Sequence, residues 1–175
     1  MRLMIRIAIT GNPGSGKSTV CSNVLKRLIC TYGGMTSADI REKGERLGFE
    51  IRDIATGKQG ILAQKQGSGP RVGSYHVNLD DLNSIGVAAI RNAVSSDLVV
   101  VDEIAPMELR SLEFIKSVEE VLDSDKNMLV VLHQRSSHRV AERIRREFES
   151  YTVTLENREN LVSEIALKIN RAFSK

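Results

Sequence analysis

The chain has 175 residues, of which 41% are hydrophobic and 27% are charged, with 13 glycines and 3 prolines. This composition is typical of a globular protein, and it excludes a disordered, a collagen-like and a membrane-spanning chain. A chain of this length can bury roughly 70% of the surface that it exposes when unfolded. We therefore predict one domain over residues 1–175 that needs neither disulfides nor a structural metal.

The net charge is small, and the charged residues are mixed. It amounts to +3, from 25 basic and 22 acidic residues. The one dense basic stretch, residues 139–146, contains Glu142 and is followed by Glu147, a mixture that does not favour nucleic-acid binding. Aromatic residues make up 4% of the chain and Trp is absent, so there is little sign of a surface that stacks bases. A nucleic-acid partner is therefore not indicated, and because no exposed apolar stripe stands out, we expect a monomer.

The N-terminal segment and the cysteines bear on the cellular compartment. Residues 1–9 carry two arginines and run into a glycine turn without a small-residue cleavage pattern, unlike a signal peptide. No apolar run approaches the roughly 18 residues of a membrane span, so we expect a cytoplasmic protein. Cys21 and Cys30 fall in one predicted helix at a separation of roughly 13 Å, which a disulfide cannot bridge. We expect both to be free thiols.

Short apolar runs alternate along the chain with segments of helical periodicity. Residues 3–10 predict a strand, and apolar residues at helical spacing predict a helix over 20–29. Residues 47–53 alternate between apolar and polar, which predicts a strand with one solvated face. Residues 56–60 can turn this strand back into 61–62. This region therefore predicts an antiparallel hairpin insertion.

The alternation continues to the end of the chain. A Gly-Ser-Gly-Pro loop at residues 67–70 precedes Asn78 and Asp81, whose spacing is typical of a helix start. Further helices are predicted over residues 82–93, 112–122, 139–148 and 161–173, and further strands over 98–101, 128–132 and 151–154. Because strands and helices alternate, we predict an α/β fold with a mostly parallel central sheet and helices on both faces.

Residues 11–18, Gly-Asn-Pro-Gly-Ser-Gly-Lys-Ser, match the phosphate-binding loop (P-loop, Walker A) at every fixed position. The motif lies between a predicted strand and a predicted helix, where its backbone N–H groups and the helix N-terminus can surround phosphates. Lys17 is predicted to bring its charge to the β- and γ-phosphates, and Ser18 to hold Mg²⁺. The predicted nucleotide-binding residues are Gly11, Asn12, Pro13, Gly14, Ser15, Gly16, Lys17, Ser18 and Thr19.

The apolar strand at 98–101 ends in two acidic residues, Asp102 and Glu103, a Walker B pattern. An Asp at the end of a neighbouring strand holds Mg²⁺ in P-loop enzymes, so Asp102 is assigned to the metal site together with Ser18. Glu103 is placed to orient and polarise a water molecule against the γ-phosphate. This pair therefore favours hydrolysis over transfer to a bound acceptor.

Two further residues are candidates for the catalytic site. Phosphoryl transfer is mostly electrostatic, and an arginine is a common supplement. Arg71 follows the 67–70 loop, whose flexibility would let its guanidinium reach the γ-phosphate; the alternative is a solvated loop arginine. His133 follows the strand at 128–132, at the end of the sheet where ligands bind. It either contacts the γ-phosphate or forms a hydrogen bond within its loop.

Several segments together indicate a family resemblance over nearly the whole chain. They are the P-loop and residues 46–51, 71–75, 101–109 and 154–158. In this order they resemble a small nucleoside-triphosphatase family of archaea and thermophilic bacteria that includes the human cancer-related nucleoside-triphosphatase. The acidic segment with Pro-Met-Glu-Leu is the most specific of them. The resemblance implies a RecA-like fold and Mg²⁺-dependent hydrolysis of ATP, GTP, CTP and UTP to the diphosphate and phosphate, with broad base tolerance.

The resemblance also implies roles for individual residues. It makes Arg71 a site residue, and it assigns Asn157 and Arg158, otherwise a helix start and a solvated charge, to contacts with the base or ribose. Two positions depart from the family pattern. Ala105 stands where the family commonly has Gly, and Ser74 stands where a longer Lys or Gln is usual. These departures bear on the turnover rate rather than on the type of reaction.

Three other functions remain as alternatives. A nucleotide or polynucleotide kinase would need clustered lid arginines, which Arg143, Arg145 and Arg146 could supply, but Glu103 favours water as the acceptor. A guanine-nucleotide switch would need an Asn-Lys-x-Asp motif, which the chain lacks. An ATPase module coupled to a nucleic-acid partner would need further segments to transmit work. We therefore predict a nucleoside-triphosphatase.

Overall fold

The structure, a computed structural model, describes residues 3–174. Its strands are β1 (Arg6–Gly11), β2 (Tyr32–Glu42), β3 (Glu45–Asp53), β4 (Gln59–Gln64), β5 (Arg71–Val72), β6 (Tyr75–Val77), β7 (Leu98–Ile104), β8 (Asn127–Leu132) and β9 (Glu149–Val153). Its helices are α1 (Lys17–Leu25), α2 (Leu79–Asp81), α3 (Ala88–Asn92), α4 (Leu112–Leu122), α5 (Arg139–Glu147) and α6 (Arg158–Phe173). Shorter turns are the π-helical η1 (Leu82–Val87) and the 3-10 turns η2 (Ala93–Ser95) and η3 (Glu108–Arg110).

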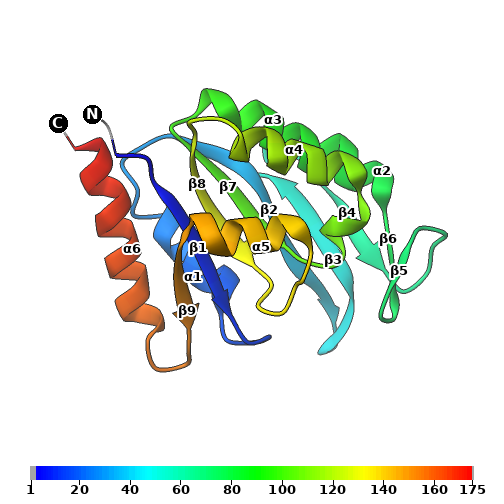
Figure 1. The fold of residues 1–175 in the computed structure, drawn as a ribbon. Coiled ribbons are helices and arrows are strands. Elements are labelled where there is room, and N and C mark those ends of the chain that lie inside the picture. The colour runs from blue at the N-terminus through cyan, green and yellow to red at the C-terminus, as the bar shows by residue number, and fades with distance from the viewer. Residues whose placement is uncertain (1–2, 175) are drawn as a thin grey trace.

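The described strands form one mixed sheet in the order β5-β6-β4-β3-β2-β7-β8-β1-β9 (Figure 1). The strands from β9 to β2 pair in parallel, and those from β2 to β5 pair antiparallel, so that four pairings are of each kind. The prediction of a mostly parallel sheet is therefore wrong. The antiparallel part is larger than the hairpin expected at residues 47–62, because β2, β5 and β6 also belong to it.

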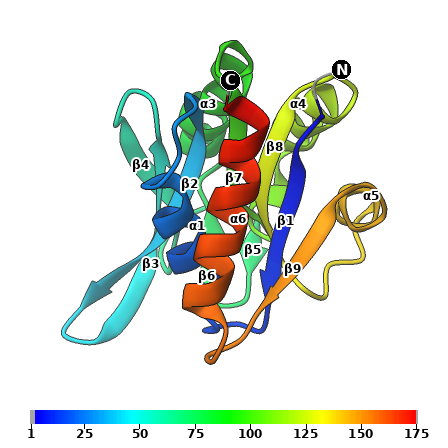
Figure 2. The ribbon, with the colours of Figure 1, turned by 90° about the vertical axis from the view of Figure 1, so that its left-hand side faces the viewer.

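Helices cover both faces of the sheet, and β7 shows why. Leu98 and Val100 pack on the face that carries α1 and α6, whereas Val99 and Val101 pack with α3, α4 and α5 on the other face. Residues 98–101 of β7 are all apolar because both faces of this part of the strand are buried. Figure 2 shows α1 and α6 together in front of the sheet. Within residues 3–174, no helix is both long and apolar enough to cross a membrane.

Two helices differ from the predictions. The helix after the P-loop ends at Leu25, so Cys30 lies beyond it, and both cysteines are free. Ile29 is 65% exposed, and its N–H donates to Asn170 Oδ1 at 3.0 Å, a tertiary contact in place of a helical one. Leu112, expected on the buried face of its helix, begins α4 and is 81% exposed. Asn78 does begin a helix, since its Oδ1 accepts from the N–H of Asp81 at 3.0 Å.

The parallel strands bring the P-loop and two further candidate residues to one edge of the sheet. The P-loop follows β1, Glu103 lies near the end of β7, and His133 follows β8, which lies between the other two strands. Parallel strands place their carboxyl ends at the same edge, where α/β proteins bind ligands. In Figure 1 the loops after β1 and β8 both lie along the lower edge.

Candidate active site

The P-loop wraps around the N-terminus of α1. Gly11 has a φ of 148°, and a Cβ atom there would lie 2.7 Å from Ser15 Oγ and 2.8 Å from the carbonyl oxygen of Val153. Only glycine fits this position. Lys17 is the first residue of α1, and its Nζ donates to the carbonyl oxygens of Gly11 at 3.2 Å and Asn12 at 3.3 Å. The loop thus combines a helix N-terminus with a lysine, which suits an anion.

Ser18 and Asp102 form the candidate metal site. Ser18 Oγ donates to Asp102 Oδ1 at 2.9 Å, and Asp102 is only 3% exposed. The pKa of Asp102 is raised to about 7, mainly because the carboxyl group is buried. The charge of Glu103 also raises this pKa, whereas the hydrogen bond from Ser18 and the charge of Lys17 lower it. From β2, Ser37 Oγ donates to the main-chain oxygen of Asp102 at 3.1 Å. Sequence reasoning missed Ser37, because β2 was not predicted.

The donor set at this site fits Mg²⁺. A hydroxyl and a carboxylate are hard oxygen ligands, and Mg²⁺ is usually held by one or two carboxylates together with substrate phosphates and water. Within residues 3–174, no group of three or more His, Cys, Asp or Glu side chains could hold a metal by itself. Ser18 and Asp102 supply two oxygen atoms of this kind.

Glu103 lies at an irregular point of β7. The register with β8 shifts between Asp102 and Ile104, and the Asp102–Glu103 peptide bond is cis. Burial raises the pKa of Glu103, the charge of Lys17 lowers it, and Asp39 raises it. The carboxylate is thus within electrostatic reach of the P-loop lysine. A raised pKa makes a carboxylate a better proton acceptor, which suits a general base.

His133 is held at the end of β8 by its backbone. Its N–H donates to the carbonyl oxygen of Ile104 at 3.0 Å, and its Nδ1 accepts from the N–H of Arg135 at 3.3 Å. Burial lowers the pKa of His133, as do the charges of Lys17, Arg145 and Arg135. The ring is therefore neutral at pH 7, with Nδ1 occupied as an acceptor and the proton assigned to Nε2.

Arg145 holds the loop that carries His133. Its guanidinium donates to the carbonyl oxygens of residues 136, 133 and 134, at 2.6, 3.1 and 3.1 Å. The sequence predicted a solvated helix face here, and the charge pattern gave no sign of this contact. Arg143, in contrast, bonds to Asp123 at 2.8 Å and Glu147 at 2.9 Å, so it is engaged on the helix side rather than in a lid.

The segment after β9 brings Arg158 to the P-loop. A Cβ atom at Gly16 would lie 2.8 Å from Arg158 Cδ and 3.1 Å from its Nη1. Asn157 instead fixes the turn, since its Oδ1 accepts from the N–H of Thr154 at 2.8 Å and its Nδ2 donates to the oxygen of Thr152 at 2.9 Å. A pocket of about 240 Å³ lies alongside, lined by Thr19, Val20, Asn23, Leu155, Glu156, Arg158, Glu159 and Val162.

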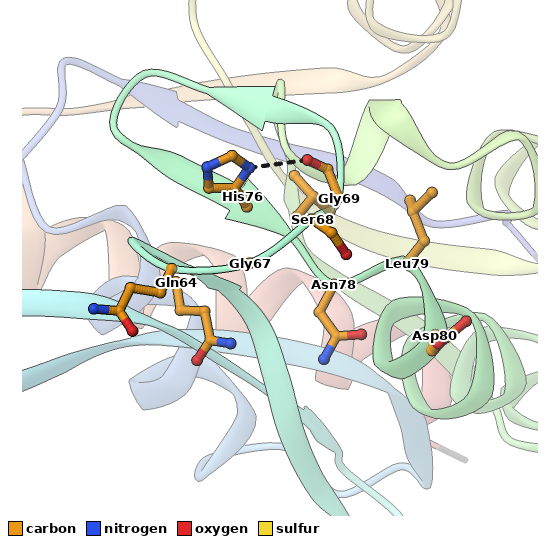
Figure 3. Close-up of a pocket in the computed structure, with 10 residues that line it drawn as sticks. Gln64, Gly67, Ser68, Gly69, His76, Asn78, Leu79 and Asp80 are labelled. Atoms are coloured by element: carbon orange, nitrogen blue, oxygen red, sulfur yellow. Dashed lines mark hydrogen bonds between the residues drawn. The ribbon is translucent and has the colours of Figure 1, made fainter.

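Arg71 lies on the edge strand β5, and four strands separate β5 from β7 in the sheet. Its Nε donates to the oxygen of Gly73 at 3.0 Å. The loop before it is tied to β6, because His76 Nδ1 bonds to the oxygen of Gly69 at 3.0 Å (Figure 3) and Val77 N–H donates to Pro70 at 2.8 Å. The structure thus anchors a loop that we expected to be free, and the catalytic role of Arg71 stays a prediction.

Comparison with known proteins identifies the family. The family model described as NTPase matches residues 6–166. The chain belongs to this NTPase family. Nucleoside-triphosphatase THEP1 of Methanosarcina acetivorans is 54% identical over 172 residues, which cover 96% of this chain and 98% of that protein. Nucleoside-triphosphatase THEP1 of Thermofilum pendens is 44% identical over 169 residues, covering 92% and 93%.

Two solved structures share the fold. The crystal structure of THEP1 from the hyperthermophile Aquifex aeolicus matches with a TM-score of 0.84 and 28% identity, over 95% of this chain and 100% of that one. The solution structure of a human cancer-related nucleoside triphosphatase matches with a TM-score of 0.78 and 28% identity, over 95% and 98%. The resemblance inferred from the sequence is therefore confirmed.

Two segments that carried the NTPase family resemblance meet in space. Arg46 lies over the ring of Phe49 at 4.9 Å and over that of Tyr75 at 5.6 Å, and these two rings are 5.1 Å apart. Arg46 Nη1 also lies 3.8 Å from Asp39 Oδ2. The charge of Asp39 raises the pKa of Glu103, which connects this cluster electrostatically to the candidate site. Its position could not be inferred from the sequence, since it depends on the pairing of β2 with β3.

Proposed function

We propose that this protein hydrolyses nucleoside 5′-triphosphates to the diphosphate and phosphate, with Mg²⁺ as cofactor. The observation that carries the proposal is the 2.9 Å bond between Ser18 of the P-loop and Asp102, with Glu103 next in the chain. The proposed substrates are ATP, GTP, CTP and UTP. The parallel strands β9-β1-β8-β7-β2 form the proposed RecA-like part of the fold. We also propose that the protein acts as a cytoplasmic monomer.

In the proposed complex, the P-loop amides and Lys17 hold the β- and γ-phosphates. The hydroxyl of Ser15 supports this placement, because it is buried and has no hydrogen-bond partner within residues 3–174. Ser18 and Asp102 would hold Mg²⁺ through oxygen atoms. When bound there, Mg²⁺ would neutralise negative charge on the phosphate oxygens.

The reaction needs a base, and Glu103 is placed to act as one. It would orient a water molecule and accept its proton as the water oxygen bonds to the γ-phosphorus. The bond from the γ-phosphorus to the bridging oxygen breaks at the same time, and the diphosphate leaves. Lys17 stabilises the charge on the phosphate oxygens, and the Nε2–H of His133 can donate to the γ-phosphate. Arg71 is the proposed further source of positive charge.

The proposed nucleoside site is the pocket beside the P-loop. Arg158 lies at Gly16, and Leu155, which is 65% exposed, lines the same pocket. A guanidinium and an aliphatic side chain can pack against the face of any base without reading its edge. This supports broad base tolerance.

The test is phosphate release from ATP, GTP, CTP and UTP with and without Mg²⁺, for the wild type and for Glu103→Gln. We expect Mg²⁺-dependent release from all four, and a loss of roughly 10²- to 10⁴-fold in the variant with nucleotide binding retained. Glu142→Gln, on the exposed side of α5, is the matched control. Equal turnover in Glu103→Gln would remove Glu103 from the mechanism, and no release by the wild type would contradict the proposed function.

A further inference from the structure

An arginine is stacked on two aromatic rings in a part of the sheet that the proposed mechanism does not use. Arg46 and Phe49 belong to β3 and Tyr75 to β6, with β4 between these strands. The register of β3 with β2 shifts between Arg46 and Gly48, so that Arg46 and Phe49 share a face. Arg46 Nε donates to the hydroxyl oxygen of Tyr75 at 3.1 Å. These contacts fix the plane of a guanidinium whose side chain is 42% exposed.

The exposed side of this guanidinium suits a planar partner. Arginine stacks on aromatic rings, and unpaired nucleic-acid bases stack on both arginine and aromatic side chains. The composition gave no sign of such a surface, because aromatic residues make up only 4% of the chain. The pairing of β3 with β4 and of β4 with β6 brings two of them together. The bases of a duplex are already stacked on one another, so the surface fits a single strand.

The charge around the stack is positive. Arg46 and Arg41 share the one carboxylate of Asp39, at 3.8 and 3.0 Å. Arg110 of η3 forms no ion pair within residues 3–174, and its Nη2 donates to the main-chain oxygen of Arg71 at 3.4 Å. Arg71 lies on β5, which pairs directly with β6, the strand that contributes the second ring of the stack. This excess of arginines attracts the phosphates of a polynucleotide.

The stack is separate from the proposed nucleoside pocket. Figure 1 shows β3, β4, β5 and β6 towards one end of the sheet and α6 at the other. The pocket is lined by residues of α1, of α6 and of the segment that precedes α6. A nucleotide bound there therefore leaves the stack uncovered.

We propose that Arg46, Phe49 and Tyr75 form a binding surface for single-stranded nucleic acid. An unpaired base stacks on the exposed face of the Arg46 guanidinium, and Arg41 and Arg110 contact the phosphates. The sequence of the bases is not read, because every base has a face that can stack. The proposal does not depend on the proposed hydrolysis, since binding is measured without turnover.

The test is fluorescence anisotropy of a labelled single-stranded oligonucleotide of about 12 nucleotides, without a 5′-phosphate, in RNA and DNA versions. We expect a dissociation constant in the micromolar range at low salt for both, and weaker binding of a duplex of the same length. Binding should persist when ADP and Mg²⁺ are added in excess, because the P-loop is not the site of contact.

Substitutions of Arg46 separate stacking from charge. Arg46→Ala should weaken binding about tenfold, and Arg46→Lys nearly as much, because lysine keeps the charge but has no planar face. Arg52→Ala is the matched control: it removes the same charge from the same strand, but on the face opposite to Phe49 and Ile51, and should change the affinity less than about twofold. Arg110→Ala should weaken binding and lower the slope of its salt dependence by about one. The urea midpoint establishes that each variant is folded.

Other results would overturn the proposal. No binding by the wild type would mean that the surface does not bind nucleic acid. Equal weakening by Arg46→Ala and Arg52→Ala, wild-type affinity in Arg46→Lys, or equal affinity for the duplex would reduce the binding to non-specific attraction by charge. Displacement by ADP would place the oligonucleotide at the P-loop. An unchanged salt dependence in Arg110→Ala would contradict its phosphate contact.

Discussion

Ser18 and Asp102 are 84 residues apart in the chain and are joined by a 2.9 Å hydrogen bond. The bond connects the first turn of α1 to β7, although β8 lies between β7 and β1 in the sheet. It is a favourable contact for a carboxyl group that is buried near the end of a strand whose first four residues are apolar. A buried carboxylate lowers the stability of the folded protein unless a cation compensates its charge. A carboxylate that suits metal binding at this site therefore destabilises the metal-free protein.

Asp102→Asn should make the metal-free protein more stable at alkaline pH. The folded state holds a proton on Asp102 up to its pKa of about 7, whereas the unfolded chain loses it near the ordinary value of 3.8. The wild type therefore loses stability as pH rises between these values, by up to about 4 kcal/mol. Unfolding by urea in a chelating buffer, at about pH 4 and about pH 8, measures this.

An exposed aspartate provides the control for the Asp102→Asn variant. Asp125→Asn changes an exposed aspartate and should show no difference that grows with pH. At about pH 4 the Asp102→Asn protein should match the wild type, because both folded proteins are then neutral at this position. If Asp102→Asn is no more stable than the wild type at about pH 8, Asp102 is not held in an unfavourable charged state.

Gly16→Ala should destabilise the protein partly through Arg158. Gly16 has a φ of 97°, which is strained for alanine, and the new Cβ would lie 2.8 Å from Arg158 Cδ. Gly57 has a φ of 75°, and no heavy atom lies within 4 Å of its Cβ position. Gly57→Ala therefore measures the backbone strain without a side-chain clash, which should lower the free energy of unfolding by about 1–2 kcal/mol. We expect Gly16→Ala to cost more than Gly57→Ala.

A double-mutant cycle tests whether Arg158 causes the difference. In an Arg158→Ala background the two alanine substitutions should lower the free energy of unfolding by similar amounts, because the contact is absent. The denaturant midpoint provides the measurement. An excess cost of Gly16→Ala that persists without Arg158 would place the arginine away from the P-loop.

The parts of the site that follow single strands could be predicted from the sequence. The P-loop, Asp102 and His133 each stand next to an apolar strand, and parallel strands place such positions at one edge. Ser37 and Asp39 could not be found, because residues 32–42 contain two adjacent glycines and several polar residues and did not predict a strand. The hydrogen bonds from Arg145 to its loop depend on tertiary packing, which cannot be predicted from the periodicity of the sequence.

Arg145→Ala should loosen the loop of His133 and raise the pKa of its ring. The guanidinium donates to three loop carbonyls, and its charge is among those that lower the pKa of His133. NMR titration of the three histidines measures the shift, and we expect kcat to fall about tenfold with KM little changed.

Two variants serve as controls for this prediction. Arg145→Lys retains the charge but cannot reach three carbonyls, so it should preserve the pKa of His133 and still lower kcat. Arg146→Ala removes an arginine 3.8 Å from Glu147 and should change neither quantity. A pKa of His133 that is unchanged in Arg145→Ala would show that the arginine does not act on the ring.

Asp39→Asn should move the acidic limb of the pH–rate profile to lower pH. The charge of Asp39 raises the pKa of Glu103, so its removal lowers that pKa. A general base must be ionised to accept a proton, and the lower pKa keeps Glu103 ionised to a lower pH. The pH profile of kcat/KM reports the pKa values of the free enzyme and is the measurement to make.

Glu42→Gln is the control for this prediction. Glu42 lies at the exposed end of β2, and its substitution removes a charge of the same sign and should leave the acidic limb in place. An acidic limb that stays in place in Asp39→Asn, or moves to higher pH, would mean that the group titrating there is not a carboxylate under the influence of Asp39.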